Sequence, residues 1–545
     1  MSADIGTDPG KTEGAYTLDH LENLELKSTM AFGLALAVSS IAQLAAARAQ
    51  DRPGGGIKTV GCPAMGSLRL PDVRITEAVA VEAGAPPGGS FKKAHCKIAG
   101  VIGREIRFEV LLPDEWNQRF FMGGGGGFVG AVVNQAAASV NAGFATAGTD
   151  TGHQASSPLQ AGWALDDLER QLNFGHLAVH RTAAVAKAIV RAYYGSDATR
   201  SYFFGCSRGG GQALMEAQRY PDDFDGIVAA APAMDWPGIA AAFVKNSQAA
   251  FPDPATLSRS VITRDNLKLL ESRILAACDA NDGVKDGVME DPRDCAFKVA
   301  DIPVCADDRP RPECLTRAQC AAIERIYAPT INQDGAIYYG QPFGGEGEVE
   351  GWQNWITGVN EPLLANAKIP SLQWAFGSEF FKYFVFHDPS WDYSRYDLST
   401  WRRDTRLVAT FMNATNPDLA GFKSGGRKLL LWHGWSDPAL SALATIGYYQ
   451  QVEARDPAVR DYFRMFLLPG VLHCGGGPGP DTVDWFTAIA DWVERGQAPD
   501  RLVATRLDKD GKVTRARALC PYPQRSVYLG TGSTEVAESY ACKAP

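Results

Sequence analysis

Short apolar runs separated by glycine recur through the first half of the chain. They cover residues 106–112, 118–122, 143–149, 201–205 and 226–231. Several of these runs are apolar at almost every position, which is typical of strands buried on both faces of a parallel sheet. Residues 177–194, between two of the runs, have the spacing and composition of a helix. This alternation predicts a doubly wound α/β sheet.

The pattern changes after Pro232. The chain is then rich in Trp, Tyr, Phe, Pro and Cys until two further strand-like runs at 428–432 and 462–468. We interpret the intervening stretch as an insertion. The predicted organisation is a leader over residues 1–49, a core formed by residues 50–235 and 426–545, and a lid formed by residues 236–425.

Composition and charge exclude some classes of protein. With 45% hydrophobic residues, the chain has enough apolar material for a large core, so disorder does not describe most of it. A net charge of -9 and a pI near 5.5 provide no general attraction to nucleic acid or to anionic membranes. We therefore expect a small-molecule substrate and no nucleic-acid partner.

A leader is predicted near the N-terminus. Residues 30–46 form an apolar run, and Ala47-Arg48-Ala49 follows as a small-x-small cleavage site. A membrane anchor is the alternative, but the run is shorter than the roughly 20 apolar residues that a spanning helix needs. The expected location is secreted or periplasmic, without membrane association after cleavage. Residues 1–29 are polar and acidic, so the true start lies either at Met1 or near Met30.

Cysteine usage also favours an oxidising compartment. The eleven cysteines form no CxxC pairs and no zinc-type spacing with histidine. Disulfides fit this usage better. Because the count is odd, at least one thiol stays unpaired, and Cys320 is our candidate.

The segment 201–210, SYFFGCSRGG, contains a candidate nucleophile. Gly205, Ser207 and Gly209 form Gly-x-Ser-x-Gly between an aromatic strand and a helix-like stretch. This context is the one the motif requires, since the sharp turn that exposes the serine needs neighbours without Cβ atoms. The alternative is an incidental glycine-rich turn.

A serine nucleophile needs a base, and the base needs a group that orients it. Three histidines follow the serine: His387, His433 and His473. His473 comes in a short loop after the 462–468 strand and is the predicted base, while the other two are interpreted as structural. Asp437 follows the 428–432 strand in the expected order and is the predicted orienting acid. A helix N-cap is the alternative role for Asp437.

Two backbone N–H groups are expected to form an oxyanion hole. One belongs to Arg208, and the other belongs to the glycine run 123–127, where we choose Gly126. A flexible loop without such a contact is the alternative for this run.

Cys206 precedes the serine and Cys474 follows the histidine. If Ser207 and His473 lie within hydrogen-bond reach, their neighbours lie within the separation that a disulfide tolerates. A bond there would join the two catalytic loops. Two unrelated buried thiols are the alternative.

With Cys206-Ser207, Asp437 and His473-Cys474, the chain resembles the tannase and feruloyl esterase family. Further matching segments are residues 148–153 (GTDTGH), 380–393 (FFKYFVFHDPSWDY) and the tail motif CPYPQ. The resemblance implies an α/β-hydrolase core, a large lid, a Ser207–Asp437–His473 triad and the Cys206–Cys474 disulfide. It also implies four further disulfides, which pair Cys62 with Cys96, Cys278 with Cys295, Cys305 with Cys314, and Cys520 with Cys542.

The segment DANDGVKDGVMED predicts a calcium loop in the lid. Asp279, Asp282 and Asp286 cluster there, and carboxylates in such a cluster repel one another unless a cation lies among them. The spacing is not that of an EF-hand. The resemblance implies structural Ca²⁺ bound by these three side chains and by the carbonyls of Val284 and Val288. A solvated acidic loop is the alternative.

The substrate prediction rests mainly on the resemblance. Nine aromatic residues gather between positions 374 and 393; they would form either a slot for a planar acyl group or, for most of them, the interior of the lid. We predict a serine carboxylesterase acting on aromatic-acid esters, with feruloyl or related hydroxycinnamoyl esters first. Galloyl esters and mono(2-hydroxyethyl) terephthalate stay open as substrates. A serine peptidase on the same fold and a calcium-dependent binding module without catalysis are the other hypotheses.

Overall fold

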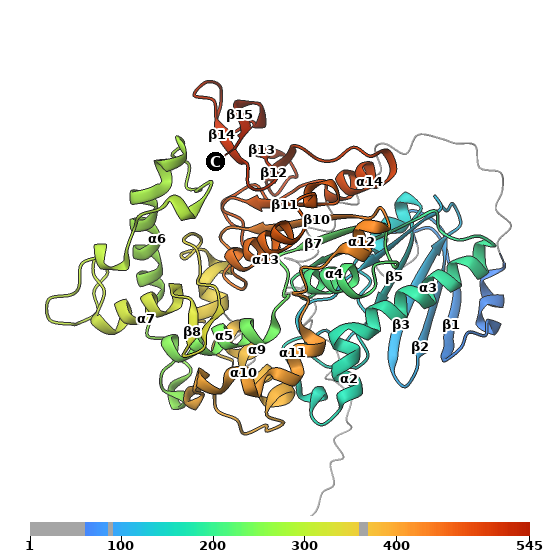
Figure 1. The fold of residues 1–545 in the computed structure, drawn as a ribbon, viewed down its shortest axis with the longest axis horizontal. Helices are drawn as coiled ribbons and strands as arrows, with labels where there is room; N and C mark the ends of the chain where they lie inside the picture. The colour runs from blue at the N-terminus through green and yellow to red at the C-terminus, as the bar shows by residue number, and fades with distance from the viewer. Residues whose placement is uncertain (1–59, 85–90, 359–368, 545) are drawn as a thin grey trace, which may run out of the picture.

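A computed structural model describes residues 60–84, 91–358 and 369–544 of the chain. Its central element is a nine-stranded sheet in the order β1-β2-β3-β5-β4-β6-β7-β10-β11 (Figure 1). The strands are β1 (Val73–Val81), β2 (His95–Ile102), β3 (Ile106–Pro113), β4 (Arg119–Gly123), β5 (Ala145–Thr149), β6 (Arg200–Cys206), β7 (Gly226–Ala230), β10 (Lys428–Gly434) and β11 (Phe463–Leu468). Each of the seven strands predicted from sequence is present, with ends within two residues of the prediction.

The sheet has an antiparallel and a parallel part. β1, β2, β3 and β5 pair antiparallel in that order. β5, β4, β6, β7, β10 and β11 pair parallel. The carboxyl ends of the parallel strands therefore lie at one edge, where ligand sites of such sheets are found.

Helices bury both faces of the sheet, which explains the continuously apolar strands. α3 (Ala178–Tyr194), α4 (Arg208–Arg219) and α13 (Ala442–Arg455) share one core with alternate strand residues such as Phe203 and Leu429. α14 (Trp485–Arg495) packs on the opposite face, in a second core with Tyr202 and Leu430. The chain has the α/β-hydrolase fold that the sequence predicts.

The insertion separates β7 from β10. It contains α5 (Trp236–Ala250), α6 (Arg264–Cys278), α7 (Arg317–Tyr327), β8 (Thr330–Asn332), β9 (Gly335–Tyr338), α9 (Leu372–Phe380), α10 (Trp401–Asp404), α11 (Arg406–Met412) and α12 (Ala420–Ser424). α6 and α7 lie around a hydrophobic cluster that includes Ile274 and Ile323 and is formed almost wholly within the insertion. In contrast, α5 and α9 contribute Ile239 and Phe376 to the main core. The insertion is thus partly a separate layer and partly an extension of the core.

Two C-terminal hairpins pack against the insertion, which the sequence analysis did not predict. They are β12 (Leu502–Leu507) with β13 (Val513–Leu519), and β14 (Arg525–Tyr528) with β15 (Tyr540–Lys543). Val284 of the insertion shares a small cluster with Ala518 and Tyr540. Figure 1 shows these hairpins, in red, beside α6. The chain's end therefore ties the insertion to the core.

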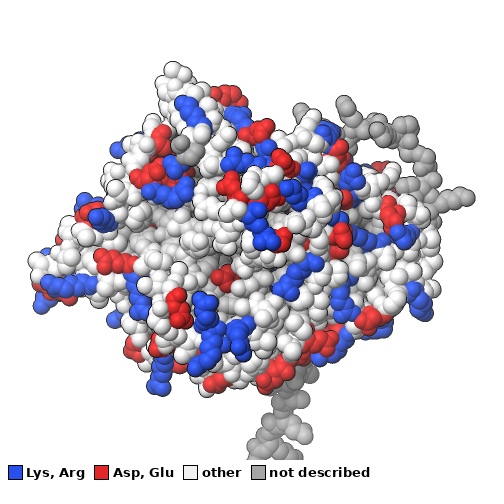
Figure 2. All heavy atoms as spheres, viewed as in Figure 1, with Lys and Arg blue, Asp and Glu red and all other residues white. Residues whose placement is uncertain are grey.

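Surface charge and helix length bear on possible contacts with membranes and other charged partners. On the face shown in Figure 2, basic and acidic side chains are interspersed. Within the described residues, no helix combines the length and the apolar character needed to span a membrane. The predicted leader over residues 1–49 lies outside the described residues.

Candidate active site

Ser207 occupies the sharp turn between β6 and α4. Its φ of 60° and ψ of −119° are strained for a residue with a side chain, as expected for a serine presented on such a turn. A Cβ on Gly205 would lie 2.3 Å from the carbonyl carbon and oxygen of Gly209. Gly205 is therefore required for the turn to close, while a Cβ on Gly209 would instead crowd the glycine run at Gly124 and Gly125.

Asp437 accepts a hydrogen bond from His473, as the order of the motifs predicts. His473 Nδ1 lies 2.8 Å from Asp437 Oδ2, and the other oxygen, Oδ1, accepts the backbone N–H groups of Ala439 and Leu440. The Asp437 side chain is wholly buried. Burial alone would raise the pKa of Asp437, but the charge of His473 and the hydrogen bonds from His433 and His473 lower it well below its usual value. The carboxylate is thus held ionised.

His433 is a second histidine on the same carboxylate. Its Nε2 lies 3.1 Å from both Asp437 Oδ2 and the carbonyl oxygen of Leu440, while its Nδ1 lies 2.8 Å from Thr445 Oγ1. Because both partners of Nε2 are acceptors, Nε2 carries the proton and Nδ1 accepts from the threonine hydroxyl. The sequence analysis interpreted His433 as structural and did not foresee its contact with Asp437. His387, on the surface, pairs with Asp166.

The loops after β6 and β11 are covalently joined. Cys206 and Cys474 form a disulfide with a Cα–Cα distance of 5.9 Å across 268 residues of sequence. Ser207 and His473 line one cavity together. The loops after β10 and β11 are also in close contact, since Ser436 N donates to the carbonyl of Val471. The three predicted residues thus converge at the carboxyl edge of the sheet.

The glycine run 123–127 lies against the nucleophile helix. A Cβ on Gly124 would lie 2.6 Å from Gly209 Cα. The N–H groups of Gly124 and Gly125 donate to Phe204 O and to Gln212 Oε1. Gly126 and Gly127 are the remaining candidates in the run, and Gly127 lines the cavity beside Ser207. The oxyanion-hole role of Gly126, our choice from sequence, stays a prediction, and Gly127 is a second candidate because it lines the cavity.

The side chain of Arg208 turns away from the backbone N–H that was predicted to serve the oxyanion hole. Arg208 is 1% exposed, and its guanidinium donates to the carbonyls of Phe174 and Gly175 and lies 4.4 Å from the Phe174 ring. Burial lowers the pKa of Arg208 to about 9. The side chain holds the π-helical turn Asn173–Leu177 beside the nucleophile.

The cavity around Ser207 is largely apolar. Its side-chain lining includes Trp236, Ile239, Phe243, Trp355, Phe376 and Leu440. Of the nine aromatic residues that the sequence analysis singled out, Phe376 is the member of this lining, while Phe380, Phe381, Phe384 and Tyr393 belong to the main core. Trp355 meets the His473 ring edge to face at 4.9 Å. Only its aromatic character marks Trp355 in the sequence, and many core residues share that character.

The predicted calcium loop is closed by its own carboxylates. Asp279 Oδ1 accepts the N–H groups of Asp286 and Gly287, and Asp282 accepts those of Val284 and Glu290. Burial raises the pKa of Asp282, and the charge of Asp286 adds to the effect. The loop thus offers the oxygen donors that Ca²⁺ prefers. However, the Asp286 carboxylate is also paired with the buried guanidinium of Arg517, which competes with a cation.

Four further disulfides join the pairs that the family resemblance implied. They are Cys62–Cys96, Cys278–Cys295, Cys305–Cys314 and Cys520–Cys542. Cys320 is unpaired, as expected. The Cys278–Cys295 bond closes the acidic loop at both ends, and Cys520–Cys542 fastens the C-terminal hairpins together.

Comparison with known proteins agrees with the family resemblance noted from the sequence motifs. The family model "Tannase and feruloyl esterase" matches residues 93–543. The mono(2-hydroxyethyl) terephthalate hydrolase of Piscinibacter sakaiensis is 32% identical, over 88% of this chain and 90% of that protein. Feruloyl esterase B of Aspergillus niger is 29% identical, over 80% of this chain and 83% of that protein.

Comparison with solved structures finds the same family. The crystal structure of feruloyl esterase B from Aspergillus oryzae matches with a TM-score of 0.77 and 25% identity, over 88% of this chain and 99% of that chain. The chain therefore belongs to the tannase and feruloyl esterase family of carboxylic ester hydrolases.

Proposed function

We propose that the chain hydrolyses esters of aromatic acids through an acyl-enzyme on Ser207, with His473 as general base and Asp437 as the orienting acid. One observation carries the proposal: Asp437 holds the His473 ring in the cavity that contains Ser207, and a disulfide joins the residues next to Ser207 and His473. Strained serine geometry at the strand–helix turn supports the same assignment.

The reaction has two halves. His473 removes the Ser207 hydroxyl proton while Oγ attacks the ester carbonyl, and the imidazolium then protonates the departing alcohol. Water cleaves the acyl-serine by the same route. The ionised Asp437 stabilises the imidazolium through the Nδ1 hydrogen bond. The backbone N–H groups of Arg208 and of Gly127 or Gly126 would hold the negative oxygen of each tetrahedral intermediate.

The lining supports an uncharged, planar acyl group. Trp355, Phe376 and Phe243 offer aromatic faces, while the one cationic side chain in the described lining, Arg208, is turned to backbone carbonyls. A free carboxylate on the acyl ring would lose water without gaining a counterion there, which is costly. Feruloyl and related hydroxycinnamoyl esters therefore fit better than mono(2-hydroxyethyl) terephthalate, and galloyl esters lie between because they add hydroxyl groups.

A side-by-side rate comparison tests the acyl preference. We expect kcat/KM for methyl ferulate to exceed that for mono(2-hydroxyethyl) terephthalate by about tenfold or more, with methyl gallate intermediate. Phe376→Ala should raise KM for methyl ferulate. Fastest turnover of the terephthalate monoester would reverse the assignment, and faster cleavage of a ferulic acid anilide than of the ester would favour a peptidase.

Reduction should inactivate the enzyme. The Cys206–Cys474 bond joins the loops that carry Ser207 and His473. Cys206→Ser with Cys474→Ser should lower kcat by about tenfold to 1,000-fold because misplacement of the base by about 1 Å costs on the order of 100-fold. Esterase kinetics measure the loss. The matched control is Cys305→Ser with Cys314→Ser, which opens a disulfide of the insertion that joins neither catalytic loop. Wild-type kinetics of the first variant would exclude a role for this bond.

Calcium is proposed to bind the acidic loop. Asp279, Asp282 and Asp286 and the carbonyls of Val284 and Val288 would hold it, and its role would be structural. Chelation with EGTA should lower the melting temperature by a few degrees, because a ligand bound to the native state alone stabilises that state. Asp282→Asn should melt lower and lose its response to EGTA. An identical EGTA response in both proteins would count against this loop.

The location is proposed to be secreted or periplasmic. Five disulfides support an oxidising compartment. The predicted signal sequence at residues 30–49 supports export.

A further inference from the structure

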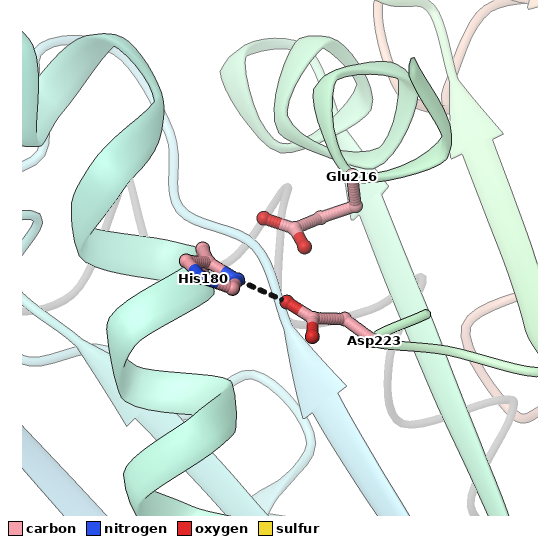
Figure 3. A group of neighbouring side chains, drawn as sticks. All are labelled: His180, Glu216 and Asp223. Carbon is pink, nitrogen blue, oxygen red and sulfur yellow. Dashed lines mark hydrogen bonds and ion pairs between the residues drawn. The ribbon is translucent and has the colours of Figure 1, made fainter. Parts of the chain in front are cut away.

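A cluster of His180, Glu216 and Asp223 lies apart from the active site. His180 comes from α3, Glu216 from α4, and Asp223 from the loop that leads to β7 (Figure 3). One ligand atom from each of the three side chains lies within 4.8 Å of the other two. Glu216 is nine residues beyond Ser207, about 13 Å along the helix axis at the usual rise per residue. The cluster is therefore a separate site.

Glu216 is buried without a hydrogen-bond partner. The residue is 1% exposed, and no group in the described part of the chain donates a hydrogen bond to either carboxylate oxygen, although a protonated Glu216 could itself donate to Asp223. Figure 3 shows the carboxylate directed toward the space that His180 and Asp223 also face. A buried carboxylate requires a partner or a proton, because its desolvation is otherwise uncompensated.

Among the described residues, the groups around the cluster form no hydrogen bond with its side-chain ligand atoms, and the one such bond joins two of the ligands to each other. Lys187 donates its ammonium to the backbone carbonyl oxygen of Asp223, while His180 Nδ1 and Asp223 Oδ2 are 2.6 Å apart. Tyr220 stacks on the His180 ring at 3.9 Å and fixes its plane. The side chains of His180 and Asp223 are 34% and 14% exposed. The cluster is therefore partly open to solvent at His180 and Asp223.

We propose that His180 Nδ1 and one carboxylate oxygen each of Asp223 and Glu216 bind a Zn²⁺ ion, with water in the fourth position. An imidazole nitrogen with two carboxylates in a small, partly closed site suits zinc, whereas calcium prefers six to eight oxygens. Zinc takes the place of the proton on His180 Nδ1, so the neutral imidazole carries its proton on Nε2, and the proton that Glu216 holds without the metal goes to solvent. Zinc would tie α3, α4 and the loop before β7 together beneath the nucleophile turn.

Zinc titration of the full chain tests the site. The protein is stripped with EDTA, resupplied with Ca²⁺ and titrated with ZnCl₂ by calorimetry at pH 7.5. Wild type should bind one equivalent that Glu216→Gln, which keeps the side-chain shape, loses or binds about 100-fold more weakly. Asp222→Asn is the control, because Asp222 is one residue from the site, 90% exposed and paired with Arg427. It should bind zinc as wild type does.

Two outcomes would overturn the proposal. The first is that wild type and Glu216→Gln bind zinc with equal stoichiometry and affinity. The second is that wild type does not bind zinc at micromolar concentrations, in which case a protonated Glu216 is the partner of Asp223. If Glu216→Gln fails to fold, the visible spectrum of Co²⁺ bound to the wild-type protein tests the site instead. Strong absorption indicates the proposed tetrahedral site, whereas weak absorption indicates an octahedral surface site and contradicts the proposal. These readouts do not depend on esterase activity.

Discussion

Ser207→Ala is expected to lower kcat for ester hydrolysis by at least about 10⁴-fold, because the nucleophile and the base act as a unit. The fold should be retained. Alanine fits the turn as serine does, and no hydrogen bond that closes the turn uses the hydroxyl: the backbone N–H of Ser207 donates to Ala230, and its carbonyl accepts from Gly211 and Ala233. Steady-state kinetics, a thermal melt and labelling by a fluorophosphonate together measure the effect.

The control for this variant is Ser424→Ala, at the end of α12 and remote from the cavity. It should keep wild-type kinetics and fluorophosphonate labelling. Turnover within tenfold of wild type in Ser207→Ala, with a normal melt, would exclude Ser207 as the nucleophile. The family assignment would then stand, but the mechanism proposed for this chain would not.

His433→Phe is expected to lower kcat by about tenfold to 100-fold with little change in KM. His433 Nε2 donates to the same Asp437 oxygen that holds His473, and a hydrogen bond to a charged group contributes about 1.5–3 kcal/mol. Without it, the buried carboxylate loses one donor and part of its orientation. His433 is thus a positioning residue that acts through Asp437.

Three comparisons separate positioning from simple loss of stability. His433→Gln retains a donor and should recover part of kcat, while Thr445→Val, which removes the partner of Nδ1, should cost less than His433→Phe. The low-field proton resonance of the Asp437–His473 hydrogen bond should shift or broaden in His433→Phe. A melting temperature that falls with kcat unchanged would indicate a role in folding alone.

The site residues that could be predicted from the sequence are those marked by a motif or by a neighbouring strand. Gly205, Ser207 and Gly209 stand at the end of an aromatic run, and the turn they form is dictated by which neighbours lack a Cβ atom. Asp437 and His473 follow apolar runs that are typical of strands. Because these two strands are parallel, the residues after them lie at the same carboxyl edge of the sheet. The sequence could not single out one glycine of the run 123–127, because every residue there is glycine, and only the packing shows that the N–H groups of Gly124 and Gly125 are already used.

The strands β1 and β13 escaped prediction for a related reason. Burial in β1 and β13 is intermediate and irregular, so neither shows the clean alternation or continuous apolar run that marks a strand. Their order comes from partners elsewhere in the chain. Arg517, in β13, pairs with Asp286 in the insertion, 231 residues away.

By itself, the sequence determined seven strands of the sheet, the nucleophile turn and the order of the catalytic residues, because each depends on residues close together in the chain. Only the tertiary structure decided that His433 shares Asp437 with His473, that Trp355 meets the His473 ring, and that Glu216 is buried beside His180 and Asp223 with no hydrogen-bond donor among the described residues. Side-chain contacts of this kind join separate elements. They depend on how the elements pack, and no spacing along the chain records that packing.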